Sequence, residues 1–462
     1  MHAYPGKGVD MAVVGLSFGS ATSGTGFDVT TTVASIMTNM RAPETLWTTQ
    51  TAALTAQDAV LSTLGTDLSA LSTALAALTS FDGSFSQKEG AVSDTTTVAL
   101  TDATTDASAG THTLTVENLA TSSQQHSSAV AAGATLSGSI TLQVGSSTTQ
   151  TIALDSSNNT VSGLAAAINN LNAGVSATVI TDSTGSRLSL TSSNSGAANT
   201  MTIDSSGMVD SDGNTVAMTV TQVGSDANFT LDGIPLTSTS NTISTALIGV
   251  TFQLLGVTSS PVTMQIAEDT STIASALATF VSAYNTVATA LAGQEAKDST
   301  GAAEPLFGDQ TLSLLQSELS SALAFATANT GKSSNLAQLG IAVGTTGLLT
   351  LDTSTLSTAL AGNFTGATNF FQDVGDFGQN LTSVLNSLGT SGNGALALRA
   401  AQNTAQERTL ADNKTNLEAR LVTYQANLTT ELNAANQILQ SIPSQLDEMK
   451  EIYAAITGYN GN

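Results

Sequence analysis

The stretch LTAQDAVLSTLGTDLSALSTALAAL, Leu54 to Leu78, decides how this chain of 462 residues is organised. Its leucines recur at intervals of seven, three, four, three, four and three residues, which is the a/d spacing of a heptad repeat. The pattern predicts one continuous coiled-coil helix from Glu44 to Ser80. At 1.5 Å per residue this helix measures roughly 55 Å, longer than a helix buried in one compact domain usually is.

A shorter helix is expected just before it. Asp28 stands where an N-cap residue accepts hydrogen bonds from backbone amides, and Pro43 interrupts the helix that Asp28 begins. The apolar residues between them recur at helical spacing: Val29, Val33, Ile36 and Met40.

Helical spacing returns after Asp269. In TSTIASALATFVSAYNTVATAL one apolar face contains Ile273, Leu277, Phe280, Val281, Tyr284 and Val287. A last long helix is expected from Leu410 to Ile456, where apolar residues are spaced mostly by three, four and seven, and Pro443 is expected to kink it.

The middle of the chain, from about Ala91 to Glu268, predicts β structure. In GTHTLTVENLA, His112, Leu114 and Val116 share one face of a strand. Turns are expected at 145–147 and 183–185, and a short helix at 161–171 is expected to end with Gly174 as its C-cap.

These segments together predict an α+β multidomain protein. Two terminal helices that flank one insertion and pack lengthwise must run antiparallel, so we expect a coiled-coil stalk, or leg, with an inserted β-rich head of two small domains. The expected divisions are a flexible arm and first helix at 1–43, a coiled-coil leg at 44–90, a β-rich head domain at 91–135 and 208–268, an inserted β module at 136–207, a helical leg domain at 269–436 and a terminal helix at 437–462.

Composition restricts the partners. The chain has 35 acidic and 11 basic side chains, a formal net charge of −24, which argues against nucleic acid and anionic membranes as partners. No apolar stretch is expected to reach membrane-spanning length. No cleaved secretion signal is expected, and translation begins at Met1 or at Met11. The absence of cysteine excludes disulfides and thiolate sites.

An enzyme is not expected. Ser17 lies in a G-x-S-x-G pattern, but the strands and the following helix that a nucleophile elbow needs are missing. DSDGN at 210–214 fits an Asp-Gly turn better than a calcium loop, because the twelfth position is Thr221 instead of glutamate. His112 fits a cross-strand role better than a metal ligand. We therefore predict no catalytic residues, no cofactor and no metal.

Several motifs resemble one family in order along the chain. GTGFDVTTTVASIMTNMRAP at 24–43 resembles the amino-terminal signature of the bacterial flagellar filament cap family, hook-associated protein 2. GLAAAINNLNAGVSATV resembles a β module found in the heads of flagellins and hook-associated proteins. The motifs of the carboxyl-terminal half follow as NFTLDGIPLTSTSNTI, FVSAYN, LFGDQTL and LAQLGIAVGTTGLLTLD.

The resemblance implies a structural, non-enzymatic protein outside the cell, exported through the flagellar type III channel. It implies a homo-oligomeric ring at the filament tip that promotes flagellin polymerisation and prevents loss of monomers, with flagellin, hook-associated junction proteins and the export machinery as partners. Two alternatives stay open: a hook–filament junction protein, and a surface adhesin whose β-rich head binds a host-surface or mucin ligand.

The terminal helices hold the candidate contact residues. The stripe in 437–462 is one that no compact domain of this chain obviously needs, so we expect it to dock on neighbouring subunits. The expected oligomer or filament contacts are Val33, Ile36, Met40, Leu439, Ile442, Leu446 and Met449.

Overall fold

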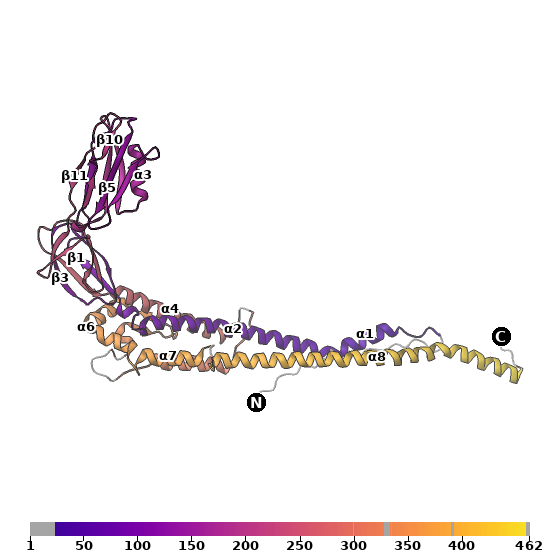
Figure 1. Cartoon of the computed structure of the whole chain (residues 1–462). Coiled ribbons are helices and arrows are strands. Elements are labelled where there is room, and N and C mark those ends of the chain that lie inside the picture. The colour runs from indigo at the N-terminus through magenta and orange to yellow at the C-terminus, as the bar shows by residue number, and fades with distance from the viewer. Residues whose placement is uncertain (1–23, 299, 328–332, 334, 390–391, 459–462) are drawn as a thin grey trace. The chain divides into compact units, whose positions relative to one another are not determined.

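The structure is a computed structural model that describes residues 24–298, 300–327, 333, 335–389 and 392–458. The chain divides into two compact units (Figure 1). The helical unit combines the residues up to Ala76 with those from Leu277 onward, and the β unit spans Ala77–Ala276. The β unit is therefore an insertion between the amino- and carboxyl-terminal parts of the helical unit, as the order of helical and β patterns predicts.

Helices dominate the helical unit, and two of them cross into the β unit at its ends. The predicted heptad helix is present, and Pro43 lies in its first turn. The first amides of a helix have no partner within it, so the N–H that proline lacks costs no hydrogen bond there. The helices are α1 (Val29–Met40), α2 (Ala42–Thr79), α4 (Thr270–Gln294), α5 (Gln310–Leu323), α6 (Thr353–Gln372), α7 (Phe377–Leu388) and α8 (Ala395–Thr457), and the strands β17 (Ile341–Val343) and β18 (Leu349–Leu351) form a hairpin.

The terminal helices run antiparallel, with α1 and α2 beside α8 (Figure 1). Contacts between them move to lower residue numbers on α8 as they move to higher numbers on α1 and α2, which defines the opposite directions. The paired residues are Phe27 with Asn436, Arg41 with Glu418, Thr55 with Glu407 and Asp58 with Asn403.

The leucine stripe of α2 and the predicted apolar face of α4 are both buried. The helical unit also contains a cluster of phenylalanines, in which Phe370 and Phe377 stack with ring centroids 5.1 Å apart and Phe280 meets Phe377 edge-on at 6.3 Å. Aromatic rings in such offset and edge-on pairs add to the stability that burial provides.

Pro443 lies inside α8, which is continuous from Ala395 to Thr457. Proline removes one N–H donor from the helix, and the turns on both sides keep their own hydrogen bonds. The kink expected at Pro443 stays a prediction. In α6 the backbone at Asn363 is non-helical.

The β unit contains two cores. The inner core lies between a five-stranded sheet of order β1-β16-β3-β12-β13 and a three-stranded sheet of order β14-β15-β2, and includes Leu114, Phe229 and Phe252. His112 shares the face of Leu114 and Val116, as predicted. The strands are β1 (Lys88–Val92), β2 (Val98–Ala103), β3 (Gly110–Asn118), β12 (Ala227–Leu231), β13 (Ile234–Ser238), β14 (Thr242–Leu247), β15 (Val250–Leu254) and β16 (Val262–Glu268).

The second core belongs to an outer module. It lies between a sheet of order β11-β4-β8-β7, a sheet in which β5 pairs with β6, β9 and β10, and the helix α3. Its elements are β4 (Ser122–Ser127), β5 (Leu136–Val144), β6 (Gln150–Leu154), α3 (Val161–Asn170), β7 (Val175–Asp182), β8 (Gly185–Ser195), β9 (Met201–Asp204), β10 (Met208–Asp210) and β11 (Met218–Gln222).

The outer module is larger than the expected 136–207. Its core runs from Val130 to Val216, because β4 pairs with β8 and β11 pairs with β4. The chain enters and leaves the module side by side at Thr121 and Ser225, whose backbones exchange hydrogen bonds of 2.9 and 3.2 Å. The helical unit ends at Ala76 and resumes at Leu277, and α8 continues across residue 436, as the expected helix from Leu410 to Ile456 predicts.

The local turns of the outer module follow the sequence patterns, with one correction. The β5–β6 and β7–β8 hairpins form around the predicted turns. α3 ends at Asn170, with Leu171 as its C-cap in right-handed backbone, so the expected C-cap at Gly174 is wrong. The left-handed residues come later, at Asn172 and Gly174.

Two helical stretches, Val29–Ser86 and Thr270–Gln294, are apolar and long enough to cross a membrane by length and composition alone, so the expectation that none approaches that size is wrong. Core helices of globular proteins meet the same criterion. The leucines from Leu54 to Leu78 in the first stretch and the face of Ile273, Leu277, Phe280 and Val287 in the second are buried, whereas Leu46 is 58% exposed.

Candidate assembly surface on the paired terminal helices

The Gly-Thr-Gly segment before α1 lies directly on α8. Gly24 and Gly26 have left-handed backbone, with φ of 64° and 63°. A Cβ on Gly26 would stand 2.1 Å from Oδ1 of Asn436, and one on Gly24 would stand 3.0 Å from the ring of Pro443. The same Asn436 oxygen accepts a 2.8 Å hydrogen bond from the Phe27 amide. Glycine is thus required twice over, for its conformation and for the close approach of the backbone.

Asp28 is the N-cap of α1, as predicted. Its carboxylate accepts hydrogen bonds from the Thr31 hydroxyl at 2.5 Å and the Thr31 amide at 3.1 Å. These bonds favour the ionised carboxylate and lower the pKa of Asp28 below its usual 3.8. The cap therefore stabilises α1 fully above pH 3.8, and this stabilisation is lost as the pH falls through the lowered pKa.

Replacing Asp28 with alanine is expected to loosen α1 at neutral pH, with a roughly fivefold increase in the opening equilibrium of its amides, measured by hydrogen exchange. Trp47, the only tryptophan, packs against the α1–α8 contact, so its fluorescence reports the same event. In the wild type the Trp47 signal should change on acidification, and in Asp28→Asn, which keeps an acceptor without a titrating charge, this change should be smaller, with the remainder due to Glu418. Asp412→Ala, at an exposed position of α8, is the control. Unchanged exchange in Asp28→Ala would contradict the role of the cap.

The inner face of α1 is buried on α8. Val29, Val33 and Met37 pack with Leu417 and Leu421 in one cluster. Val33 is only 4% exposed, so α8 covers the surface that the expected contact of Val33 with another subunit needs. Ile36 is half-buried and Met40 is exposed, so both keep surface for a partner.

An ion pair closes this contact at the end of α1. Arg41 bridges Glu418 on α8 and lies 3.5 Å from Glu44. Hydrogen bonding from Arg41 lowers the pKa of Glu418. Because both side chains remain partly exposed, the pair contributes to the alignment of the helices more than to their stability.

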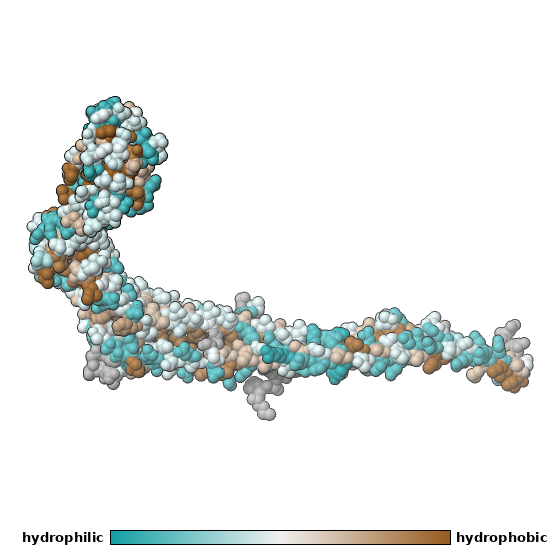
Figure 2. All heavy atoms as spheres, in the orientation of Figure 1, coloured by the Kyte–Doolittle hydropathy of each residue, from teal (hydrophilic) through white to brown (hydrophobic). Residues whose placement is uncertain are grey.

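The apolar face of α8 continues beyond the part that the amino-terminal segment covers. Leu439 and Ile442 are half-buried, whereas Leu446 is 39% and Met449 67% exposed. Figure 2 shows the apolar side chains gathered at the carboxyl-terminal end of α8. The exposed large apolar residues from Leu446 onward are Leu446, Met449, Ile452, Tyr453 and Ile456.

A polar cluster that the heptad pattern did not reveal lies between α2, α5 and α8. Asn403 is fully buried, and its amide donates to Asp58 at 2.7 Å. Arg399 donates to Asn403, to Asp309 at 2.8 Å and to Gln57 at 3.1 Å. Burial raises the pKa of Asp309, but the bonds from Arg399 and from the Thr311 amide outweigh it and lower that pKa overall. In the sequence, the signal of this cluster is an asparagine at a heptad position, seven residues after Leu396 and seven before Leu410.

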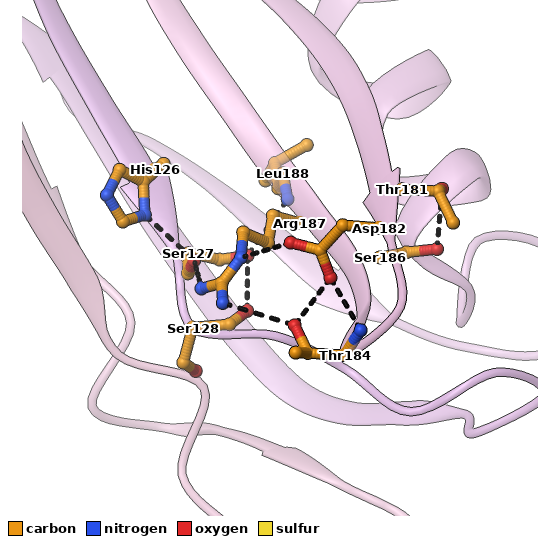
Figure 3. Close-up of polar contacts among 9 residues, drawn as sticks. All are labelled: His126, Ser127, Ser128, Thr181, Asp182, Thr184, Ser186, Arg187 and Leu188. Carbon is orange, nitrogen blue, oxygen red and sulfur yellow. Dashed lines mark hydrogen bonds and ion pairs between the residues drawn. The ribbon is translucent and has the colours of Figure 1, made fainter.

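The outer module has a smaller polar cluster at its β7–β8 turn (Figure 3). Arg187 lies 3.7 Å from Asp182 and donates to the Ser127 carbonyl at 3.4 Å, and the Ser127 hydroxyl accepts from the Leu188 amide at 2.9 Å. His126 contacts the same Ser127 carbonyl at 3.0 Å. The cluster ties the turn to the end of β4.

The residues weighed for catalysis or metal binding have other roles where the structure describes them. His112 contacts the Asp232 carboxylate at 2.8 Å across the sheet. Asp210 accepts from the amides of Asp212 and Asn214, which makes DSDGN a turn. Among the described residues, no group of three or more His, Asp or Glu side chains is placed to hold a metal. Ser17 lies outside the described residues.

Two family models match this chain. The model of the flagellar hook-associated protein 2 N-terminus matches residues 25–123, and that of its C-terminus matches residues 224–444. The first match begins at Thr25 and includes α1 and α2, and the second includes most of α8. The matches stop and resume at the two ends of the outer module.

Individual relatives agree. The chain is 30% identical over 394 residues to the B-type flagellar hook-associated protein 2 of Pseudomonas aeruginosa, covering 77% of this chain and 79% of that protein. It is 32% identical over 337 residues to flagellar hook-associated protein 2 of Escherichia coli O157:H7, covering 65% and 70%. The crystal structure of domains D1–D3 of the flagellar cap protein FliD from Escherichia coli matches with a TM-score of 0.56 and 28% identity, covering 75% of this chain and 99% of that one. The chain therefore belongs to the flagellar hook-associated protein 2 family, whose Escherichia coli member is the flagellar cap protein.

Proposed function

We propose that this chain caps the distal end of the flagellar filament, where a ring of copies promotes flagellin polymerisation and prevents the loss of monomers. It acts outside the cell, at the flagellum tip, after export through the flagellar type III channel. Flagellin, further copies of the chain, hook-associated junction proteins and the export machinery are its partners. Family membership supports the role.

The single observation that carries the mechanism is the apolar face of α8. This face is covered by the chain itself at Leu417 and Leu421 and becomes exposed from Leu446 onward. A helix stripe that is buried over part of its length and bare over the rest has surface for another molecule. We assign the bare part, together with Met40, Ile36, Leu439 and Ile442, to contacts with flagellin or a neighbouring copy.

The alternatives predict different outcomes for the same strain. A hook–filament junction protein would be found at the base of the filament. The two family models favour the cap, because each is a model of flagellar hook-associated protein 2. A pure adhesin would leave filament growth unchanged when it is removed.

The test compares a strain that lacks this chain with the same strain complemented by it. We expect the deletion strain to release most flagellin as monomer and to form few or short filaments, because nothing retains arriving subunits. The measurements are flagellin in the medium, filament length by electron microscopy and the position of an antibody label. Label at the hook would support the junction protein, and normal filaments with lost surface attachment would support the adhesin.

A further inference from the structure

The contact between α2 and α8 has a repeat that does not by itself fix one alignment. On α8 the part beside α2 has Leu396, Asn403 and Leu410 at every seventh position, and the facing part of α2 has Trp47, Leu54 and Leu61 at every seventh position. Moving one helix by seven residues, about 10 Å, again brings large apolar side chains of one helix beside large apolar side chains of the other. The apolar part of the contact therefore distinguishes poorly between the native alignment and a shift of one heptad.

A surface groove of about 400 Å³ lies between the two helices, lined by Gln50, Ala53 and Leu54 of α2 and by Gln406, Thr409 and Leu410 of α8. Leu54 is buried and Leu410 is half-buried.

The polar cluster of Arg399 and Asn403 does distinguish the alignments. In the native alignment Asn403 bonds to Asp58, and Arg399 bonds to Gln57 and Asp309. After a shift of one heptad, Leu396 or Leu410 would lie opposite Asp58, and Asn403 would lie opposite Thr51 or Gly65. The buried amide of Asn403 and the half-buried carboxylate of Asp58 would lose each other as partners, and this loss costs free energy that no apolar contact replaces.

We propose that Arg399 and Asn403 are positioning residues that hold α8 against α2 in one register. A single buried asparagine at an a position is a known means of specifying alignment in paired helices. Asp309 anchors the cluster to α5, because its carboxylate also accepts the Thr311 amide at 2.8 Å. The cluster thereby sets how far the apolar end of α8 extends past Gly24. This goes beyond the capping role and is testable without it.

The test uses pairs of introduced cysteines, for which this cysteine-free chain is a clean background. Thr55→Cys with Glu407→Cys reports the native register, since these side chains are hydrogen-bonded at 3.0 Å. Thr55→Cys with Ala400→Cys or with Lys414→Cys reports a shift of one heptad in either direction. The purified full chain is treated with a bis-maleimide shorter than the rise of one heptad, about 10 Å.

In the otherwise wild-type chain we expect crosslinking in the native pair only. Asn403→Leu should raise crosslinking of a shifted pair by about tenfold or more in a chain that keeps its helix content, because the shifted register no longer separates Asn403 from Asp58. Asn433→Leu, an exposed position on α8, is the matched control and should leave the pattern unchanged.

The double variant Arg399→Leu with Asn403→Leu should shift at least as much as Asn403→Leu. If the double variant loses its helix content, the crosslinking pattern of Asn403→Leu alone tests whether the cluster fixes the register. Native-only crosslinking in a folded Asn403→Leu chain would overturn the proposal, because alignment would then come from the apolar contacts or from the connections of α8. The crosslinking pattern is measured on the purified chain and does not depend on filament growth in the deletion strain. Failure of this inference and failure of the proposed function are therefore distinguishable.

Discussion

Replacing Leu446 and Met449 together with aspartate is expected to leave filaments short and to release flagellin into the medium. These two side chains stand at the start of the bare part of the α8 stripe, 39% and 67% exposed, so the substitution disturbs little within the chain itself. If the stripe docks on flagellin or on a neighbouring copy, each new carboxylate would be buried without a partner. An unpaired buried charge costs several kcal/mol, which is a loss in affinity of a hundredfold or more.

The measurement is filament length against secreted flagellin in the deletion strain that expresses only this variant. Val422→Asp is the matched control, because Val422 is as exposed as Met449 and lies off the stripe of Leu417 and Leu421. Normal filaments in the double variant would contradict the docking role of the stripe. If the variant is missing from the medium and from the filament, the stripe serves export or folding instead.

Removing the guanidinium of Arg399 is expected to destabilise the helical unit by about 3 kcal/mol. Arg399 joins α8 to α5 through Asp309 and to α2 through Gln57, and its side chain is largely buried. In Arg399→Ala the carboxylate of Asp309 and the amide oxygen of Asn403 would both remain in a protein environment without their donor. A unit of this size should then melt roughly 5–10 °C lower.

Thermal unfolding followed by circular dichroism at 222 nm checks this expectation. Arg408→Ala, at an exposed position on the same helix, should change the melting temperature by no more than about 1–2 °C. Arg399→Lys should recover only part of the loss, because an ammonium group does not reproduce the fork that bonds three partners at once. A melting temperature in Arg399→Ala equal to that of the control would show that the cluster adds no stability.

The features that the sequence predicted well are those that depend on neighbouring residues. The heptad spacing of α2, the cap at Asp28 and the hairpin turns of the outer module each involve residues within one or two turns of chain, and each is present. Such local preferences are consistent with the final fold, so periodicity and turn chemistry are enough to find them.

The features that it missed depend on partners far away in sequence. Arg399 and Gln57 are separated by 342 positions, and nothing near either residue indicates the other. The membership of β4 in the outer module is of the same kind, because β4 belongs to it through pairing with β8, about 65 positions later. The burial of Val33 also depends on distant residues, since it packs on Leu417 and Leu421 of α8.

The side-by-side crossing at Thr121 and Ser225 makes the outer module interchangeable in principle. Paired backbones of antiparallel strands lie about 5 Å apart, so any folded domain whose two ends are that close could be grafted between them without stretching the inner sheets. The module could equally be shortened to a tight turn. For a protein at the far end of a filament, this joint offers a place to display an enzyme, an epitope or a label to the surroundings, while the helical unit is left unchanged.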